Sequence, residues 1–114
     1  SLIDTADHYG MGIIAFCRLY QGLLTDKYIN GTPSSSRAAK TTGLIRDGDL
    51  SESVILCIKE LNKIASDRSQ TLAQMALSWV LRDDKITSAL IGASSAKQVI
   101  ENTKCVENLN FSSE

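Results

Sequence analysis

A short polar segment supplies the residue types best suited to chemistry in this sequence. Gly92-Ala93-Ser94 is followed by Ser95 and then by Gln98, Glu101 and Asn102, and the spacing places the last three on one face of a helix. Glycine lets a ligand approach the backbone, and the first N–H groups of a helix favour an anion. A phosphate beside the neutral, hydrogen-bonding edge of an adenine would suit this face. A capped helix that follows a strand and carries surface polar residues would explain the same pattern without a ligand.

Two apolar runs would have to position this segment. Ile13–Phe16 follows the glycines of Gly10-Met11-Gly12, and Ile86–Ile91 leads directly into Gly92. Neither run alternates polar with apolar residues, which is typical of strands that are buried on both faces of a parallel sheet. We therefore predict a strand over each run.

Three helices are predicted from periodicity and capping patterns. Residues 51 to 65 carry apolar side chains at spacings of three and four, with Ser51 as the N-cap. A second helix begins near residue 72 after a Thr71/Gln74 capping box, and a third runs from a Ser95/Gln98 capping box to about residue 104. The apolar face of the first helix consists of Val54, Ile55, Ile58, Leu61 and Ile64, and that of the second of Leu72, Met75, Ala76, Trp79 and Val80. We expect Met75 and Trp79 to pack in the core.

This order of strands and helices indicates an α/β fold with parallel pairing. The chain of 114 residues allows one domain, whereas a complete large barrel needs roughly 250 residues. Two strands do not make a stable sheet alone. We therefore expect more protein, or a second copy of the chain, to cover the strand edges, and we predict self-association through exposed edges.

Charge and cysteine content exclude several classes of function. The formal net charge of -1 gives no bulk attraction to nucleic acid or to an anionic membrane, and no apolar run is long enough to cross a bilayer. Cys17, Cys57 and Cys105 are widely spaced, which favours reduced thiols in a cytoplasmic protein over disulfides or a metal site. The first residues carry neither a Met nor a signal-peptide pattern, and we expect a fragment of a longer protein.

Three blocks of the sequence resemble the aldo-keto reductases. They are Gln21–Tyr28 followed by Arg37, then Gln70–Leu81, and finally Leu90–Ser94 followed by Gln98, Glu101 and Asn102. The resemblance is closest to the branch that contains voltage-gated potassium channel β subunits and bacterial glyceraldehyde-phosphate reductases. It runs across nearly the whole chain in the same order and with similar spacing.

The resemblance implies a (β/α)8 TIM barrel that binds NADP at the carboxyl ends of its strands. Ile13–Phe16 would be strand seven and Ile86–Ile91 strand eight, so residues 1–114 would form one partial domain from the C-terminal portion of an incomplete barrel. Residues 32–49, which include Arg37, Lys40 and Arg46, would be a basic loop on the cofactor side.

The resemblance also assigns roles to single residues. Phe16 would stack on the nicotinamide, and Arg37 would reach over the cofactor. The pyrophosphate would be lined by Leu19, Gly22, Thr25 and Lys27, and the adenosine end would be held by Gly92, Ala93, Ser94, Gln98, Glu101 and Asn102.

Two departures from the family pattern affect the cofactor site. Cys17-Arg18 replaces the Ser/Thr-Pro pair that usually follows the aromatic residue. Ser95 stands where the family tends to place an arginine that pairs with the 2′-phosphate, and Lys97 could substitute only as a point charge. The preference for NADP over NAD is therefore open, and NAD is a possible cofactor.

Asp4 and Tyr9 imitate the catalytic pair of the family. They have its spacing of five, but Tyr9-Gly10 leads directly into the strand-seven block, and in this branch the end of the sixth helix reads much like residues 2 to 12. We interpret the pair as lookalikes, with a catalytic pair joined by deletion as the alternative, and we predict no catalytic residue. His8 is the sole histidine, and no metal site is expected.

Two functions are compatible with the sequence. The first is the cofactor-binding C-terminal part of an NADP-dependent aldo-keto reductase, an oxidoreductase that reduces a small carbonyl substrate by hydride transfer. This part lacks the catalytic lysine and histidine and is expected to be inactive alone. The alternative is part of a regulatory subunit that senses a nicotinamide cofactor, as channel β subunits do. A purely structural α/β segment without a ligand also stays open.

Overall fold

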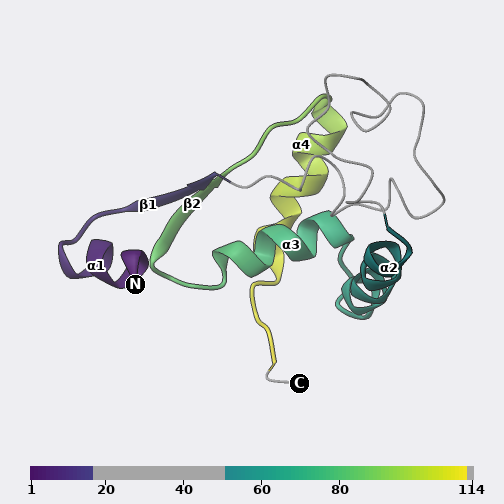
Figure 1. Cartoon of the computed structure of the whole chain (residues 1–114). Coiled ribbons are helices and arrows are strands. Elements are labelled where there is room, and N and C mark those ends of the chain that lie inside the picture. Colours follow the sequence, from purple (N-terminus) through teal and green to yellow (C-terminus); the bar gives the residue numbers. More distant parts are fainter. Residues whose placement is uncertain (17–50, 113–114) are drawn as a thin grey trace. The chain divides into compact units, whose positions relative to one another are not determined.

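The computed structural model describes residues 1–16 and 51–112 (Figure 1). The elements follow the order α1 (Leu2–His8), β1 (Ile13–Phe16), α2 (Glu52–Asp67), α3 (Leu72–Leu81), β2 (Ile86–Leu90), α4 (Ala96–Thr103) and the 3-10 turn η4 (Lys104–Glu107). The described residues belong to two compact units, one of residues 1–16 and 74–112 and the other of residues 51–73. The first unit carries both strands and α4.

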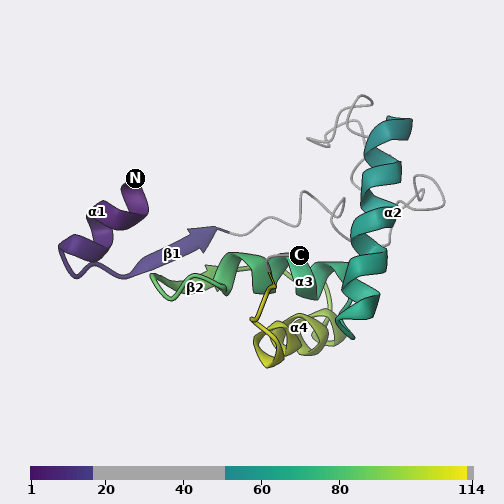
Figure 2. The same cartoon turned by 90° about the horizontal axis from the view of Figure 1, so that it is seen from below.

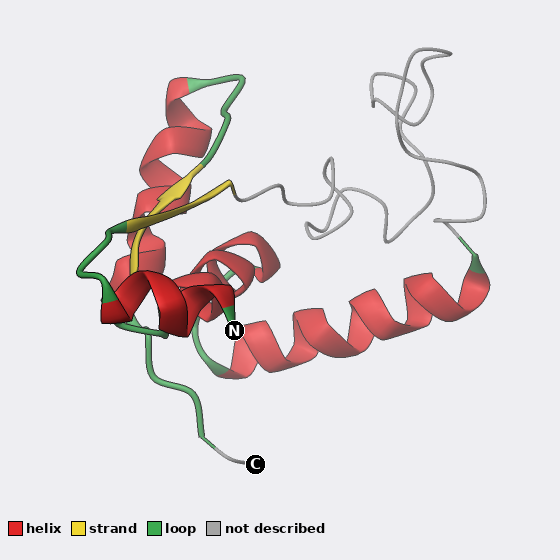
Figure 3. Cartoon of the chain, turned by 60° about the vertical axis from the view of Figure 1, so that its left-hand side comes forward, coloured by secondary structure: helices red, strands yellow, loops and turns green. Residues whose placement is uncertain are grey.

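The strands β1 and β2 pair in parallel, which confirms the predicted α/β class for the described residues (Figure 3). Ile13 pairs with Ile86 and Phe16 with Leu90, and the register shifts after Ile13. At this shift the Ile13 N–H donates to the Thr87 hydroxyl oxygen over 3.0 Å. A Cβ on Gly12 would lie 3.1 Å from the same oxygen. Glycine at position 12 therefore leaves room for the hydrogen bond between Ile13 and Thr87, which joins the two strands where their register shifts.

The prediction that both strands are buried on two faces is wrong for the described structure. Ile14 is 69% exposed, Phe16 64% and Leu90 54%. Within the described residues the sheet contains two strands, and a sheet of two strands offers little cover for either face. The apolar composition of the two runs is typical of strands that are covered on both faces, and the described residues do not provide that cover.

Helix α1 ends in a Schellman motif at Gly10. The Met11 N–H donates to the Ala6 carbonyl and the Gly10 N–H to the Asp7 carbonyl, both over 2.9 Å. Gly10 has a φ of +66°, a left-handed conformation that costs other residues a steric penalty. This turn ends the helix and sends the chain into β1.

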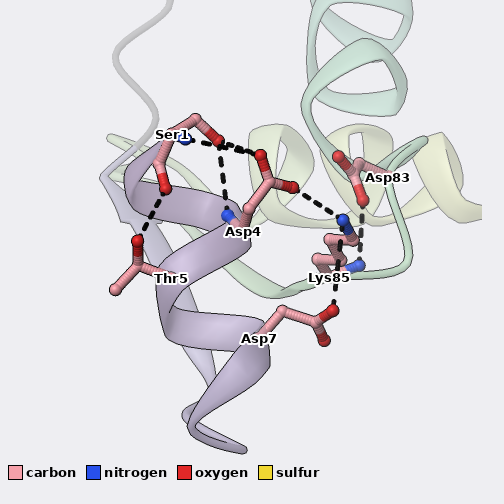
Figure 4. A network of polar contacts seen from close by, with 6 residues as sticks. All are labelled: Ser1, Asp4, Thr5, Asp7, Asp83 and Lys85. Atoms are coloured by element: carbon pink, nitrogen blue, oxygen red, sulfur yellow. Dashed lines mark hydrogen bonds and ion pairs between the residues drawn. The ribbon is translucent and has the colours of Figure 1, made fainter.

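An ion-pair cluster joins α1 to the start of β2 (Figure 4). The Lys85 ammonium lies 2.8 Å from a carboxylate oxygen of Asp4 and 4.0 Å from one of Asp7. The Lys85 backbone N–H donates to the Asp83 carboxylate over 3.0 Å, so the backbone of the turn before β2 is also fixed.

Buried polar contacts join α3 to α4 and η4, and Figure 2 shows α3 beside α4. The Gln74 amide nitrogen donates to the Glu101 carbonyl over 2.7 Å. The Ser78 hydroxyl lies 2.7 Å from the Cys105 carbonyl and 2.8 Å from the Gln74 carbonyl. These contacts bury Gln74 and Ser78 beside Met75 and Leu77, so the buried face of α3 includes polar residues that apolar periodicity does not reveal.

The prediction that Trp79 packs in the core is wrong, whereas Met75 is buried as predicted. Trp79 is 51% exposed. Its ring meets Phe111 edge to face at 5.0 Å between centroids and lies 3.6 Å beneath the guanidinium of Arg82. Two side chains therefore cover part of the indole outside the core.

Helix α2 begins after Ser51, as predicted, and extends two residues beyond the predicted end. The Ser51 hydroxyl makes no capping hydrogen bond and instead lies 3.2 Å from that of Ser53. Ile58 and Ala65 are buried, but Leu61 and Ile64 are exposed. The predicted apolar face of α2 is thus only partly buried among the described residues.

Candidate functional site

The first turn of α4 is organised by hydrogen bonds among Ser94, Ser95 and Gln98. Ser95 is the predicted N-cap, and its hydroxyl oxygen accepts from the Gln98 N–H over 3.2 Å. The Gln98 side chain does not return to the Ser95 backbone, as a reciprocal capping box requires. Its amide oxygen instead accepts from the Ser94 N–H over 2.8 Å and from the Ser94 hydroxyl over 3.0 Å. Ser94 therefore fixes the orientation of the Gln98 amide.

Asn102 lies one turn beyond Gln98 on α4 and is 8% exposed. Its side chain has no hydrogen-bond partner within residues 1–16 and 51–112. The two other buried polar side chains of the described structure, Gln74 and Ser78, both bond to backbone carbonyls. A buried polar group without a partner costs roughly 1 to 3 kcal/mol and calls for a structural or functional explanation.

The spacing of the site residues is confirmed as helical, but their burial differs. Gln98 and Glu101 are exposed, whereas Asn102 is buried. In a helix the Cα–Cβ bonds tilt toward the N-terminus, and positions four apart share a face. The Asn102 side chain thus leaves the helix toward the turn that carries Gln98.

Gly92 connects β2 to this turn without a steric need for glycine. Its φ is not positive, and an added Cβ would meet no described atom within 4 Å. Gly10 and Gly12, in contrast, are each explained by a backbone conformation or a close neighbour. The space in front of Gly92 is open to a ligand that approaches the backbone.

Phe16 and the Gly92 segment lie at the same edge of the sheet. Phe16 pairs with Leu90, two residues before Gly92, because the carboxyl ends of parallel strands meet at one edge. The structure therefore places Phe16 at the end of the strand pair from which the Gly92 segment continues. The other predicted contacts, which are Leu19, Gly22, Thr25, Lys27, Arg37 and the loop 32–49, lie outside the described residues.

Asp4 and Tyr9 lie at the opposite end of the strands. Asp4 contacts Lys85, which immediately precedes β2, and Tyr9 caps α1 before β1. The hydrogen bond from Lys85 lowers the pKa of Asp4 to about 2, with smaller effects from the Ser1 hydroxyl and the Lys85 charge. The hydrogen bond from Asp4 and its charge raise the pKa of Lys85. No hydrogen bond joins Tyr9 to Lys85 in the described part of the chain, and Tyr9 instead packs edge to face on His8.

The described residues offer neither a metal-binding cluster nor a membrane-spanning helix. They contain no cluster of three or more His, Cys, Asp or Glu side chains that could hold a metal ion. None of their helices is long and apolar enough to cross a membrane. Cys57 is exposed and Cys105 is buried, and both are free thiols.

The described residues form a mixed α/β fragment with two parallel strands and a polar turn after β2. A model of the aldo/keto reductase family matches residues 1–114, and the chain belongs to this family. Members of the family generally use a nicotinamide cofactor, and the family assignment implies that the chain is part of a TIM barrel.

Individual relatives agree with the family assignment. The chain is 47% identical over 114 residues to L-glyceraldehyde 3-phosphate reductase of Escherichia coli K12, an alignment that covers 97% of the chain and 33% of that protein. It is 34% identical over 109 residues to a protein of Schizosaccharomyces pombe provisionally named a voltage-gated potassium channel subunit beta, with 93% and 32% covered. The chain thus spans about a third of the length of the curated relatives it matches.

Proposed function

We propose that this chain is the cofactor-binding C-terminal part of an NADP-dependent aldo-keto reductase. In this proposal β1 and β2 are strands seven and eight of the barrel, and residues 1–114 form one partial domain with 32–49 as a basic loop over the cofactor. The family match and the 47% identity to an L-glyceraldehyde 3-phosphate reductase support it. A carbonyl compound would be the substrate of the complete protein.

The buried amide of Asn102 is the observation that carries the proposal. It is the buried polar side chain of the described structure that lacks a partner among the described residues, and it lies one turn beyond Gln98 on α4. An adenine ring offers both nitrogen acceptors and an amino donor, which a carboxamide can match. Gly92 gives access to the backbone, and Gln98 and Glu101 supply exposed polar groups beside it. These residues fit the adenosine end of a nicotinamide cofactor.

In this proposal, other residues would hold the remaining parts of the cofactor along the same edge of the sheet. Phe16 would stack on the nicotinamide, and Leu19, Gly22, Thr25, Lys27 and Arg37 would hold the phosphates between its two ends. When bound, the cofactor supplies the hydride for carbonyl reduction. The chain's own residues bind and orient it.

We propose no catalytic residue in this chain. Asp4 and Tyr9 lie before the amino ends of β1 and β2, whereas barrel enzymes place their sites at the carboxyl ends. The Asp4 carboxylate is engaged by Lys85. This placement supports the interpretation of the pair as lookalikes, and the 114-residue chain alone should reduce no aldehyde with NADPH.

A channel-type regulatory subunit is the second candidate, because the Schizosaccharomyces pombe relative is 34% identical. Both candidates use the same cofactor site. Turnover of a carbonyl substrate by the complete protein separates them, since a reductase cycles many times and a sensor needs only to bind.

The proposed site is tested by saturation-transfer NMR of NADP with the 114-residue chain. We expect saturation of the adenine protons, and we expect Asn102→Leu to abolish it. Because leucine has a similar branched shape and no polar atoms, the same variant should raise the free energy of unfolding by about 1 kcal/mol.

The two readouts of Asn102→Leu separate a binding role from a structural one. A variant that melts at a lower temperature and still transfers saturation to adenine would contradict the proposal. Lys104→Met, an exposed change beyond α4, should alter neither readout and serves as the control.

A further inference from the structure

Two side chains of α3 hold the backbone of α4 and η4. The Gln74 amide nitrogen lies 2.7 Å from the Glu101 carbonyl, and the Ser78 hydroxyl lies 2.7 Å from the Cys105 carbonyl. The last carbonyls of a helix lack partners within the helix, so Gln74 supplies a donor near the end of α4. From the first contact to the second, donor and acceptor both advance by about one helical turn. This part of the chain therefore follows α3 rather than touching it at one point.

The chain beyond η4 meets α3 again through two aromatic rings. Residues 108–112 belong to no helix or strand, and Phe111 among them is half-buried. Its ring lies edge to face on Trp79 at 5.0 Å between centroids, while the Arg82 guanidinium lies 3.6 Å from the centre of the same indole. Trp79 nevertheless stays 51% exposed. This aromatic clasp, Trp79 with Phe111, is thus a small contact outside the core.

The aromatic clasp is weak compared with the buried contacts of α3. An aromatic pair shifts an equilibrium by roughly two- to tenfold beyond the effect of its buried area. Ser78, in contrast, is fully buried with its hydroxyl on two carbonyls. Segments with few buried contacts open locally at a lower free energy than the whole fold. Residues 108–112 can therefore leave α3 while the contacts of Ser78 persist.

We infer that residues 108–112 form a strap that closes on Trp79, and that the closed strap favours the cofactor-binding form of α4. The strap continues directly from η4, whose Cys105 carbonyl is held by Ser78. When the strap is open, η4 is anchored on one side only, and the stretch that keeps Asn102 buried gains freedom. The coupling rests on the proposed function, because it requires Asn102 to contact the cofactor.

This coupling is reciprocal, which gives it two independent readouts. If closure of the strap favours cofactor binding, bound cofactor must favour closure by the same factor. Trp79 is the sole tryptophan of the chain, so its fluorescence reports closure without a label. Loss of the aromatic pair should weaken cofactor binding by no more than the roughly two- to tenfold factor by which the pair favours closure.

The test combines acrylamide quenching of Trp79 fluorescence with the dissociation constant of oxidised NADP from NMR titration, both on the 114-residue chain. Phe111→Ala should raise the quenching constant, because the indole loses the ring that covers it. The same variant should weaken NADP binding roughly two- to tenfold. Added NADP should lower the quenching constant of the wild type and leave that of Phe111→Ala unchanged.

Two further variants serve as controls. Phe111→Tyr keeps the aromatic ring and should behave as the wild type in both measurements. Val106→Ala removes an apolar side chain of η4 that is 61% exposed and lies outside the aromatic clasp, and it should also change neither measurement. Circular dichroism of each variant checks that its helices are retained, so that a general loss of structure is not taken for an open strap.

Failure of the strap, of the coupling and of the proposed function give different results. If Phe111→Ala leaves the quenching constant unchanged, the strap does not close on Trp79. If NADP binds the wild type without changing the quenching constant, or binds Phe111→Ala as tightly, the coupling is wrong while the cofactor site stands. If NADP at millimolar concentration does not bind the folded wild type, the proposed function is wrong and the coupling with it.

Discussion

Gly10 and Gly92 illustrate, at the scale of single residues, how the same residue type serves structure in one place and a proposed site in another. Gly10 needs its left-handed φ of +66° to close the Schellman motif of α1. Gly92 has neither a positive φ nor a described neighbour that would meet a Cβ. A matched pair of alanine variants therefore separates the two roles.

Gly10→Ala should lower the free energy of unfolding by about 1 kcal/mol, because alanine is penalised in the left-handed region. Gly92→Ala should leave the free energy of unfolding unchanged or raise it by about 0.5 kcal/mol, because alanine lowers the conformational entropy of the unfolded chain. The same variant should weaken NADP binding. Thermal unfolding by circular dichroism and NMR titration measure the two effects. A loss of stability in Gly92→Ala without a loss of binding would contradict the assigned role.

Ser78 is the buried hydroxyl that connects α3 to η4. It is fully buried, and its oxygen lies 2.7 Å from the Cys105 carbonyl. Ser78→Ala should cost about 1 to 3 kcal/mol, because the acceptors lose a donor in a place that water cannot easily reach. Chemical denaturation measures the loss. Ser88→Ala, on an exposed position of β2, should change stability by less than about 0.5 kcal/mol, and an equal effect of the two variants would count against the assignment.

The scale of elements shows what local patterns in the sequence can and cannot predict. Both strands, the start of α2 and the cap at Ser95 depend on neighbouring residues, and all were predicted within a residue or two. The exposure of Trp79 was not predicted, because apolar spacing does not show which part of a helix face other elements cover. Residues far apart in the sequence decide the burial of Gln74 and Ser78, whose partners lie 27 positions away.

The candidate site divides in the same way. The positions of Gln98 and Glu101 on an exposed helix face follow from periodicity, and the cap at Ser95 follows from the serine–glutamine spacing. The hydrogen bonds from Ser94 to the Gln98 amide oxygen and the burial of Asn102 could not be predicted from spacing, because each depends on how side chains pack. The presence of Ser94 four residues before Gln98 was the sequence signal that could have revealed the contact between them.

The contact between α1 and the start of β2 should depend on pH through Asp4 and Lys85. The pKa of Asp4 falls from its usual 3.8 to about 2 in the folded chain, so the pair stabilises folding above about pH 4 and its contribution is lost as the pH falls through about 2. The pKa of Lys85 is raised above 10.5, so that contribution is present below this pH and is lost when the pH rises beyond it. Hydrogen exchange of the α1 amides at several pH values should show this window.

Lys85→Met should return the pKa of Asp4 toward 3.8, because the hydrogen bond from Lys85 is the largest cause of the shift. Carbon-13 NMR of the Asp4 carboxyl measures it directly. Asp7→Asn is the matched control, because Asp7 lies 4.0 Å from the ammonium and contributes less. An Asp4 pKa that stays near 2 in Lys85→Met would show that Lys85 is not its cause.

At the scale of the whole molecule, the open sheet is the feature with the clearest physical consequence. The described sheet has two strands, and Ile14 and Phe16 of β1 are more than half exposed. The relatives are about three times as long as this chain, so in a complete barrel other strands would cover these edges. An uncovered edge with apolar side chains is a template for pairing with a second copy, and we predict that the 114-residue chain associates with itself.

Sedimentation velocity over a range of concentrations tests this prediction. The wild type should shift to larger species as concentration rises, and Ile14→Lys should suppress the shift because a lysine on an edge strand opposes pairing. Val106→Lys places the same change on an equally apolar residue outside the sheet, which is 61% exposed, and should leave the association intact. A wild type that stays monomeric, or equal suppression by both variants, would mean that the strand edges do not drive association and that the chain protects them in another way.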